Sequence, residues 1–211
     1  MAYAQTKYEE HLNVLTHGIM AAAVMLMLPW AVWNAGRVSL RNGVGVAVFC
    51  GCLILMFGVS AVYHGLPAGG AAKKVLNRLD HMAIFFAIAG SYTPIAIAVI
   101  GGRTGQSILI MEWILVLVGI LFKVLAFKKN RLTWILSTVL YLLMGWAVVI
   151  CLPVFIRQAN PVFAWLILAG GIFYTGGILF FAQSRRYAHV IWHFFVNAGA
   201  ACHFLAITVF L

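Results

Sequence analysis

Residues 43–64 read GVGVAVFCGCLILMFGVSAVYH and contain no Asp, Glu, Lys or Arg. A helix that crosses the hydrocarbon of a bilayer needs about 20 mostly apolar residues, so this run is long enough to span a membrane. The whole chain has the same character, since 64% of its 211 residues are hydrophobic and 9% are charged. A soluble domain carries about 25% charged residues, and disorder requires low hydrophobicity, so both classes are excluded.

Six further apolar runs flank this one, separated by charged or Gly- and Pro-containing breaks. These runs are continuous rather than alternating with polar residues, which excludes a transmembrane β-barrel. The sequence therefore predicts an all-α membrane protein, a single domain over residues 1–211 formed by a seven-transmembrane helix bundle. The predicted helices cover about 14–34, 43–64, 80–101, 106–127, 132–152, 161–182 and 188–211. The first run is longer than the core of a signal peptide, so we expect a retained helix.

The positive charges predict how the bundle is oriented. Seven spans place the two termini on opposite sides of the membrane, and the loops on the N-terminal side hold more cations. That side collects Lys7, Lys73, Lys74, Arg78, Lys128, Lys129, Arg131, Arg185 and Arg186, and the other collects Arg37, Arg41, Arg103 and Arg157. The cation-rich side is expected to be cytoplasmic, with the C-terminus outside, in a multi-pass protein of the inner (plasma) membrane. No basic segment is long enough to bind nucleic acid, and the residues leave the oligomeric state open.

Two pairs of polar side chains stand one helical turn apart inside the spans. Ser60 and His64 lie near the end of the second predicted helix, and His189 and His193 lie at the start of the last. A spacing of four residues places each pair on one helix face. Ionisable groups within a membrane are costly and usually functional.

Asp80 opens the third predicted helix, with His81 beside it. Topology alone puts these residues at the same depth as the two pairs, just inside the cytoplasmic boundary. Three His, a carboxylate and a hydroxyl at one depth suggest a metal site, since catalytic zinc takes three protein ligands and a water. The alternative is a set of interfacial His bonded to loop carbonyls. His17, near the same end of the first helix, either supports a ligand or packs between helices, and packing is favoured.

Two other ionisable residues fall outside this cluster. Glu112 lies in the fourth predicted helix, and we expect it to be interfacial. His203 follows His193 by ten residues, about 15 Å along the helix axis, which is too far to share a metal ion. A buried polar contact is expected for His203.

Several strings in the chain are characteristic in combination and cover nearly its whole length. They are EExxNxxTHG at 9–18, SxxYH at 60–64, RLDHxAI at 78–84 with AGSYTP at 89–94, and GGxxYxxG at 170–177 with YxHxxWHxF at 187–195 and HF at 203–204. With these strings the chain resembles the haemolysin III family, the bacterial branch of the progestin and adipoQ receptor superfamily. The resemblance implies a seven-helix fold with the N-terminus inside.

The resemblance also implies a site. In this sequence the zinc ligands would be His64, His189 and His193, with Asp80 and Ser60 completing the site. The superfamily is grouped with alkaline ceramidases, which have a similar site and hydrolyse lipid amides. Members of the family have been named for haemolysis, and bacterial members are linked to membrane homeostasis.

Two functions remain open at this point. The first is a Zn²⁺-dependent hydrolase of a membrane lipid amide or ester, in which Asp80 orients the attacking water or takes its proton, and Ser60 forms a hydrogen bond with Asp80, the water or the developing oxyanion. The second is a non-enzymatic pore former, channel or lipid sensor in which zinc is structural. A channel would need a polar stripe along several helices, whereas the outer halves of the predicted spans are almost wholly apolar.

Overall fold

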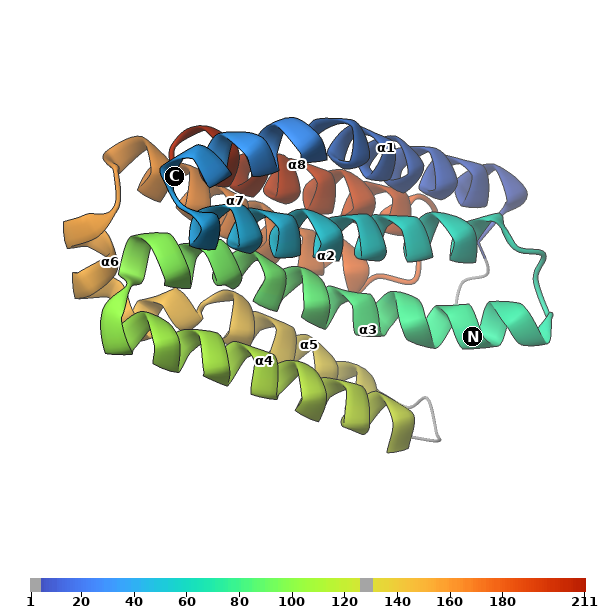
Figure 1. Cartoon of the computed structure of the whole chain (residues 1–211). Coiled ribbons are helices and arrows are strands. Elements are labelled where there is room, and N and C mark those ends of the chain that lie inside the picture. Colours follow the sequence, from blue (N-terminus) through green and yellow to red (C-terminus); the bar gives the residue numbers. More distant parts are fainter. Residues whose placement is uncertain (1–4, 126–130) are drawn as a thin grey trace.

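The computed structural model describes residues 5–125 and 131–211. Within these residues there is no β-strand, and seven helical segments are long and apolar enough to cross a membrane, which confirms the predicted all-α bundle. The helices run alternately up and down, so α1 begins at one end of the bundle and α8 finishes at the other (Figure 1). The elements are α1 (Lys7–Val38), α2 (Leu40–Gly65), α3 (Ala71–Pro94), η1 (Ile95–Ile100), α4 (Gly102–Leu125), α5 (Arg131–Gly145), η2 (Ala147–Cys151), α6 (Leu152–Gln158), α7 (Pro161–Phe181) and α8 (Ala188–Val209).

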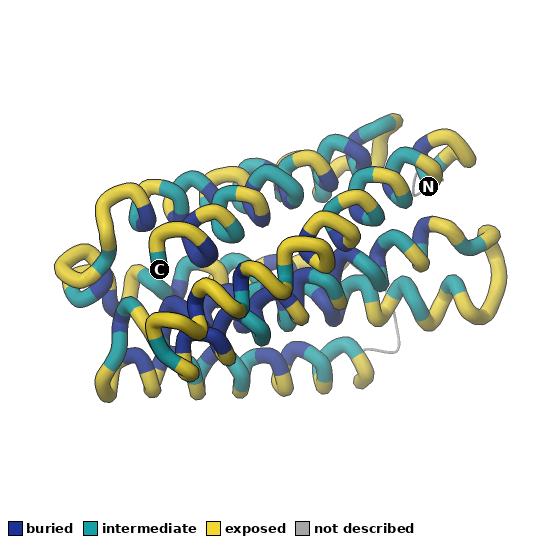
Figure 2. Tube along the Cα trace, turned by 45° about the horizontal axis from the view of Figure 1, so that its top comes forward, coloured by how far each residue is buried: buried dark blue, intermediate teal, exposed yellow. Residues whose placement is uncertain are grey.

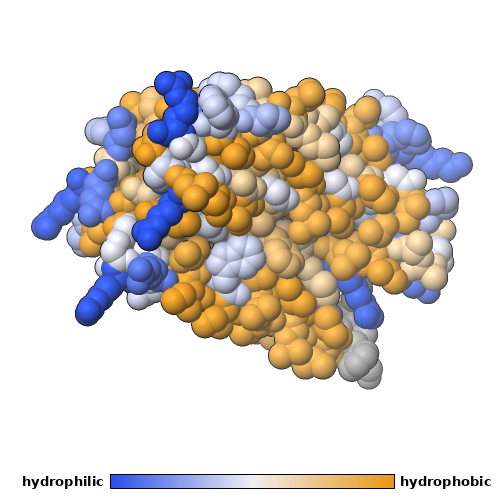
Figure 3. Space-filling view, in the orientation of Figure 1, coloured by the Kyte–Doolittle hydropathy of each residue, from blue (hydrophilic) through white to orange (hydrophobic). Residues whose placement is uncertain are grey.

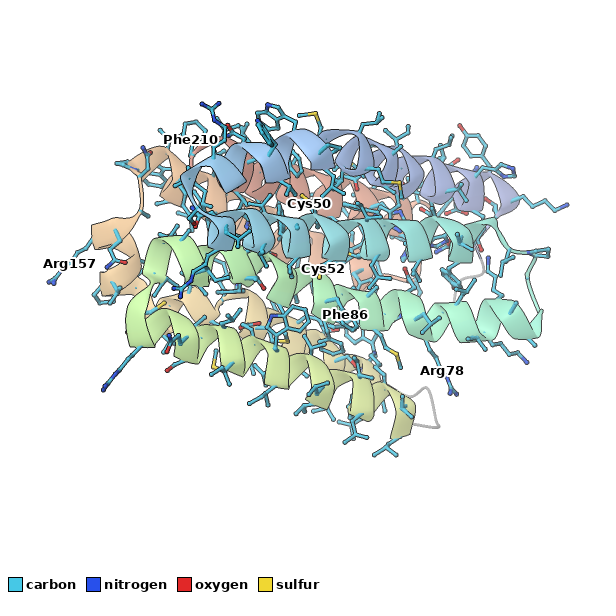
Figure 4. All side chains as sticks on the ribbon, viewed as in Figure 1. Cys50, Cys52, Arg78, Phe86, Arg157 and Phe210 are labelled. Atoms are coloured by element: carbon cyan, nitrogen blue, oxygen red, sulfur yellow. The ribbon has the colours of Figure 1, made fainter. Side chains whose placement is uncertain are left out.

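Polar residues gather at the two ends of the bundle, and apolar residues cover the surface between them (Figure 3). We call the end at which α2 finishes and α8 begins the His64 end, and the opposite end the Arg157 end. Arg157 lies at the end named after it, and Arg78 lies on the half of the bundle toward the His64 end (Figure 4). The described cations divide between the helix ends as the sequence predicts, while Lys128 and Lys129 lie outside the described residues.

The third helix differs most from its predicted bounds. It begins at Ala71, nine residues before Asp80, and the connection from α2 shrinks to residues 66–70. Asp80 therefore lies within the helix rather than opening it. The reason is that hydropathy marks only the apolar part of a helix, whereas the segment Ala71–Asn77 (AAKKVLN) consists largely of good helix formers and continues the helix beyond it.

The fifth predicted helix is interrupted near one end. It runs regularly from Arg131 to Gly145 and then changes to a 3₁₀ turn, η2, before continuing as α6. The third helix is interrupted as well, because after Pro94 its last turns, η1, have the wider π geometry. Both irregular turns lie toward the Arg157 end, so the helices that form the His64 end are regular there.

Buried residues line the inward faces of the helices, and exposed residues face outward (Figure 2). Small residues allow close helix contacts: a side chain on Gly43 would approach the backbone of Gly36, and one on Gly90 would overlap Cys52. One expectation is wrong here. Glu112 is not interfacial but fully buried, at 0% exposure, because the inward face of α4 carries it against α3.

Candidate metal centre

Three of the residues that the sequence singles out converge at the His64 end. His64 comes from the last turn of α2, and His189 and His193 come from the first turns of α8. One ligand nitrogen from each ring lies within 4.8 Å of the other two, so the group can hold a metal ion. His64 and His193 are buried and His189 is half-buried. The spacing of four residues on α8 brings its two rings to the same side, as predicted.

His64 is oriented by a carboxylate on α1. Its Nδ1 lies 2.6 Å from Oε2 of Glu10, whose other oxygen accepts a hydrogen bond from Lys73 Nζ at 2.7 Å. An ionised carboxylate only accepts hydrogen bonds, so Nδ1 of His64 carries the proton. The lone pair of Nε2 is therefore directed at the other two His. A carboxylate behind a ligating imidazole is the usual support for a zinc ligand.

His193 is oriented in the same way by a hydroxyl. Thr16 Oγ1 donates to the carbonyl of Asn13 at 3.0 Å, and it also lies 3.0 Å from Nδ1 of His193. Because the hydroxyl proton is already used, Thr16 accepts from Nδ1–H, and Nε2 of His193 keeps its lone pair. Asn197, one turn further along α8, donates to the carbonyl of Thr16 at 3.2 Å and fixes α1 against α8.

The distance between two of the rings matches metal coordination. Nε2 of His64 and Nε2 of His189 are 3.3 Å apart. Two nitrogens bound at about 2.05 Å to a tetrahedral zinc ion would be about 3.3 Å apart. The free Nε2 lone pairs of His64 and His193, together with the Nε2 of His189 beside that of His64, are a donor set that zinc accepts. The residues present therefore fit a zinc ion.

Glu9 positions the two helices that meet at this site. Its carboxylate accepts hydrogen bonds from the backbone and hydroxyl of Thr6, completing the capping box that starts α1. The other carboxylate oxygen accepts from the backbone N–H of Tyr187 at 2.7 Å. Tyr187 has a left-handed backbone, with φ 59°, immediately before α8 begins. Glu9 thus ties the start of α1 to the turn that presents His189.

His17 contacts the centre through its ring face. The ring is stacked on that of His193, with centroids 3.6 Å apart and planes 1° apart. Neither ring nitrogen has a hydrogen-bond partner within the described parts of the chain. The contact that the structure shows is therefore ring stacking on a candidate ligand, and the hydrogen bond expected of a packing residue is absent from the described residues.

Asp80 and Ser60 are not part of the group of converging ligand atoms. Ser60 is buried one turn before His64. The Asp80 side chain is 15% exposed, and its carboxylate lies 3.9 Å from Nδ1 of His81. That nitrogen of His81 also lies 2.7 Å from the carbonyl of Asn77 in the preceding turn. The structure thus unites the three predicted His, and the predicted carboxylate lies on α3 next to His81, outside the group of ligand atoms.

The sequence does not identify Glu10, Thr16 or Lys73 as residues that support the metal ligands, although the structure connects all three to the centre. A signal was present in the first helix. Glu10, Asn13 and His17 follow one another at spacings of three and four, which places them on one helix face. A polar stripe of this kind at the start of an apolar helix indicates a buried polar partner, here the rings of α2 and α8.

Comparison with known proteins places the chain in a family. The model of the family described as haemolysin-III related matches residues 5–204. "Hemolysin-3 homolog" of Bacillus subtilis (strain 168) is 34% identical, over 94% of this chain and 92% of that protein. "Hemolysin-3" of Bacillus cereus is 31% identical, over 96% and 92%. The human "Monocyte to macrophage differentiation factor" is 26% identical, over 99% and 87%.

Proposed function

The chain belongs to the haemolysin-III-related family of integral membrane proteins, and on that basis we propose that it is a zinc-dependent hydrolase of lipid amides or esters. His64, His189 and His193 hold the ion in this proposal. The observation that carries it is the 3.3 Å separation of the two Nε2 atoms, with the Nδ1 proton of His64 bound by Glu10. Three protein ligands are the number found in catalytic zinc sites, which keep one position open.

Zinc in such a site supplies Lewis acidity toward water and toward a carbonyl oxygen. The chain's own groups must then orient the reactants and carry protons. Glu10 and Thr16 keep the ring nitrogens of His64 and His193 in the tautomer that binds a cation. Lys73 balances the charge of Glu10, so the carboxylate stays ionised behind His64.

Asp80 is the carboxylate proposed to accept the proton from water. The chain has four acidic residues, and three of them are committed elsewhere. Glu9 caps α1, Glu10 binds His64 and Lys73, and Glu112 is buried in the span of α4. Asp80 remains, partly exposed at the His64 end, where a carboxylate can exchange protons with solvent.

A membrane lipid suits the position of this site. The His cluster lies where the apolar spans α2 and α8 meet the His64 end of the bundle, and hydrophilic residues gather at both ends of the molecule (Figure 3). A lipid presents its amide or ester bonds at that depth while its acyl chains remain among the helices. On the positive-inside rule we propose that this end faces the cytoplasm.

The test is a turnover measurement on reconstituted protein. Vesicles that contain an N-acyl lipid and an ester lipid, each carrying a labelled acyl chain, are incubated with wild-type protein and with His193→Ala. Mass spectrometry follows the released fatty acid. The proposal expects release by the wild type, loss of release after chelation or in the variant, and recovery of wild-type release when zinc is restored. Equal background release by both proteins would contradict it.

One observation favours a second function, in which zinc is a structural clip. The ligands join α2 to α8, and their supporting groups come from α1, so a bound ion would hold three helices together. In that case the protein would contain zinc and lose thermal stability on chelation, yet release no fatty acid from any vesicle. The same preparation therefore separates the two functions.

A further inference from the structure

Glu112 is a carboxylic acid inside the membrane span of α4. Its side chain is 0% exposed, and neither carboxylate oxygen has a hydrogen-bond partner among the residues that the structure describes. It follows Gly102, the first residue of α4, by ten residues, which is about 15 Å along the helix axis. This depth is well within the hydrocarbon of a bilayer. The residue plays no part in the metal centre at the other end of the bundle.

The face of α4 that carries Glu112 is packed tightly on the third helix. Gly105 and Gly119 stand seven residues before and after Glu112 on this face, and both are buried. A side chain on Gly105 would overlap the carbonyl of Ala96, and one on Gly119 would overlap the ring of Phe85. Glu112 is therefore held in the middle of a close contact between α4 and the helix formed by α3 and η1.

Neighbouring contacts at this level are aromatic and apolar. Trp113 donates its indole N–H to Thr93 Oγ1 at 3.2 Å. Phe86, which is labelled in Figure 4, packs edge-on against the Trp113 ring, with centroids 6.2 Å apart. Val116, one turn beyond Glu112, belongs to an apolar cluster with Phe85 and other buried side chains. Water is thus excluded from the side of Glu112 that faces this contact.

The titratable groups around Glu112 have other partners or lie far away. On α3, Tyr92 is buried, and its hydroxyl donates to the carbonyl of Gly145 at 2.9 Å and accepts from the N–H of Val148 at 2.8 Å. The segment η1 contains only Ile, Ala and Val. On α5, the hydroxyl of Tyr141 is bound to the carbonyl of His81. In η2, the thiol of Cys151 donates to the carbonyl of Val148.

The charged residues of α4 itself are also distant. Arg103 and Lys123 stand nine and eleven residues away, about 14 Å and 17 Å along the axis. An ionised carboxylate without a partner is strongly unfavourable in such surroundings. A bound monovalent cation would need several free oxygen ligands, whereas the Tyr92 hydroxyl and the Gly145 carbonyl are already bonded to each other.

We propose that Glu112 is a proton-binding site in the membrane interior, a neutral carboxyl group enclosed by α3, α4 and α5. The third and fifth spans are both irregular, at the π turn of η1 and the 3₁₀ turn of η2, and the hydroxyl of Tyr92 accepts a hydrogen bond from Val148 in the second.

A hydrophobic carbodiimide tests the proposal, because it reacts with protonated carboxyl groups in apolar surroundings. The carboxyl proton passes to a carbodiimide nitrogen and the carboxyl oxygen bonds to the central carbon, and the adduct then rearranges to a stable N-acylurea. Purified wild-type protein and Glu112→Gln are treated in detergent micelles at pH 6 and pH 9, digested and mapped by mass spectrometry. We expect an adduct on the peptide containing Glu112 at pH 6, less at pH 9, and none in the variant.

Infrared spectroscopy is a second test of the protonation state of Glu112, and it needs no chemical reaction. The wild type should show the carbonyl stretch of a protonated carboxyl at neutral pH, and Glu112→Gln should lack this band. The zinc content of the variant should equal that of the wild type, which separates this site from the metal centre. Absence of both the adduct and the band in the wild type would overturn the proposal. Protection of Glu112 by sodium at constant pH would also overturn it, in favour of a cation site.

Discussion

Glu10 on the first helix and His64 at the end of the second are joined by a 2.6 Å contact between Oε2 and Nδ1. The pair fixes which nitrogen of His64 carries a proton, and thereby leaves Nε2 free for a metal ion. Lys73, from the first turn of the third helix, binds the other oxygen of Glu10. One carboxylate thus connects three helices to the candidate metal centre.

Replacing Glu10 should weaken metal binding without removing a ligand. Glu10→Gln loses the negative charge behind His64 and leaves Lys73 without its partner, and loss of such a supporting group lowers metal affinity about 10–100-fold. Competition with a chromogenic chelator measures the change. His11→Ala is the matched control, since His11 is exposed on the same helix and, among the described residues, its ring lies in hydrogen-bond reach of the carbonyl of Lys7. Equal affinities for the Glu10→Gln protein and the wild type would show that the contact does not support the ligand.

Thr16 allows the same idea to be tested on His193. Thr16→Val keeps the shape of the side chain but removes the oxygen that accepts from Nδ1–H, so metal affinity should fall about 10–100-fold. Thr16→Ser keeps the oxygen and should retain nearly wild-type affinity in the same chelator assay. If the Thr16→Val and Thr16→Ser proteins have the same metal affinity, the hydroxyl has no part in orienting His193.

The sequence predicts the fold and the three His for a physical reason. A membrane span is recognised in a sequence by about 20 mostly apolar residues. Counting the spans then gives each polar residue a depth in the membrane. His64, His189 and His193 could be grouped in this way without any contact information. The start of α3 at Ala71 could not be predicted from hydropathy, because the first turns of this helix contain polar residues and give no hydropathy signal.

Long-range pairs and helix irregularities are the other features that the sequence conceals. Glu10 and His64 are separated by 54 positions, and nothing local to either residue reveals the partner. The burial of Glu112 depends on how α4 is rotated against α3, which two glycines and the neighbouring rings decide. The fifth span breaks at η2 before Pro153, and the hydroxyl of Tyr92 accepts from the N–H of Val148 within the break, a pairing that the sequence does not reveal.

Asp80 should matter for turnover and not for metal binding. Asp80→Asn preserves the size of the side chain and removes the proton acceptor, and loss of a general base typically costs about 10²–10⁴-fold in rate. Zinc content should stay at the wild-type level, measured on the same preparation as fatty acid release. Full turnover by Asp80→Asn would rule out the proposed role of this carboxylate.

Metal retention should depend on pH in a defined direction. All three imidazoles must be neutral to bind, so protons compete with the ion, and metal affinity falls as the pH is lowered. Stepwise dialysis to lower pH should therefore release zinc that dialysis at pH 7.5 retains, and readjustment to pH 7.5 with added zinc should restore it. Zinc retained at every step, through repeated dialysis against fresh acidic buffer, would contradict an all-His site.

The contact of α7 with α8 gives a prediction about stability. A side chain on Gly170 would overlap the ring of His203, so Gly170→Ala must displace a buried ring and should cost about 1–3 kcal/mol, seen as a lower Tm in detergent. Gly51→Ala is the control, because no atom lies within 4 Å of the added carbon. That variant should match or slightly exceed the wild type. If the two variants had the same Tm, α7 and α8 would not be packed this closely.

Metal content decides whether the three His bind an ion. Wild type, His64→Ala, His189→Ala and the exposed-site control His11→Ala are purified in detergent without chelator and measured by elemental mass spectrometry. We predict about one zinc per chain in wild type and control, and loss of the ion from both cluster variants. Wild-type protein without zinc, or zinc retained in both cluster variants, would contradict it.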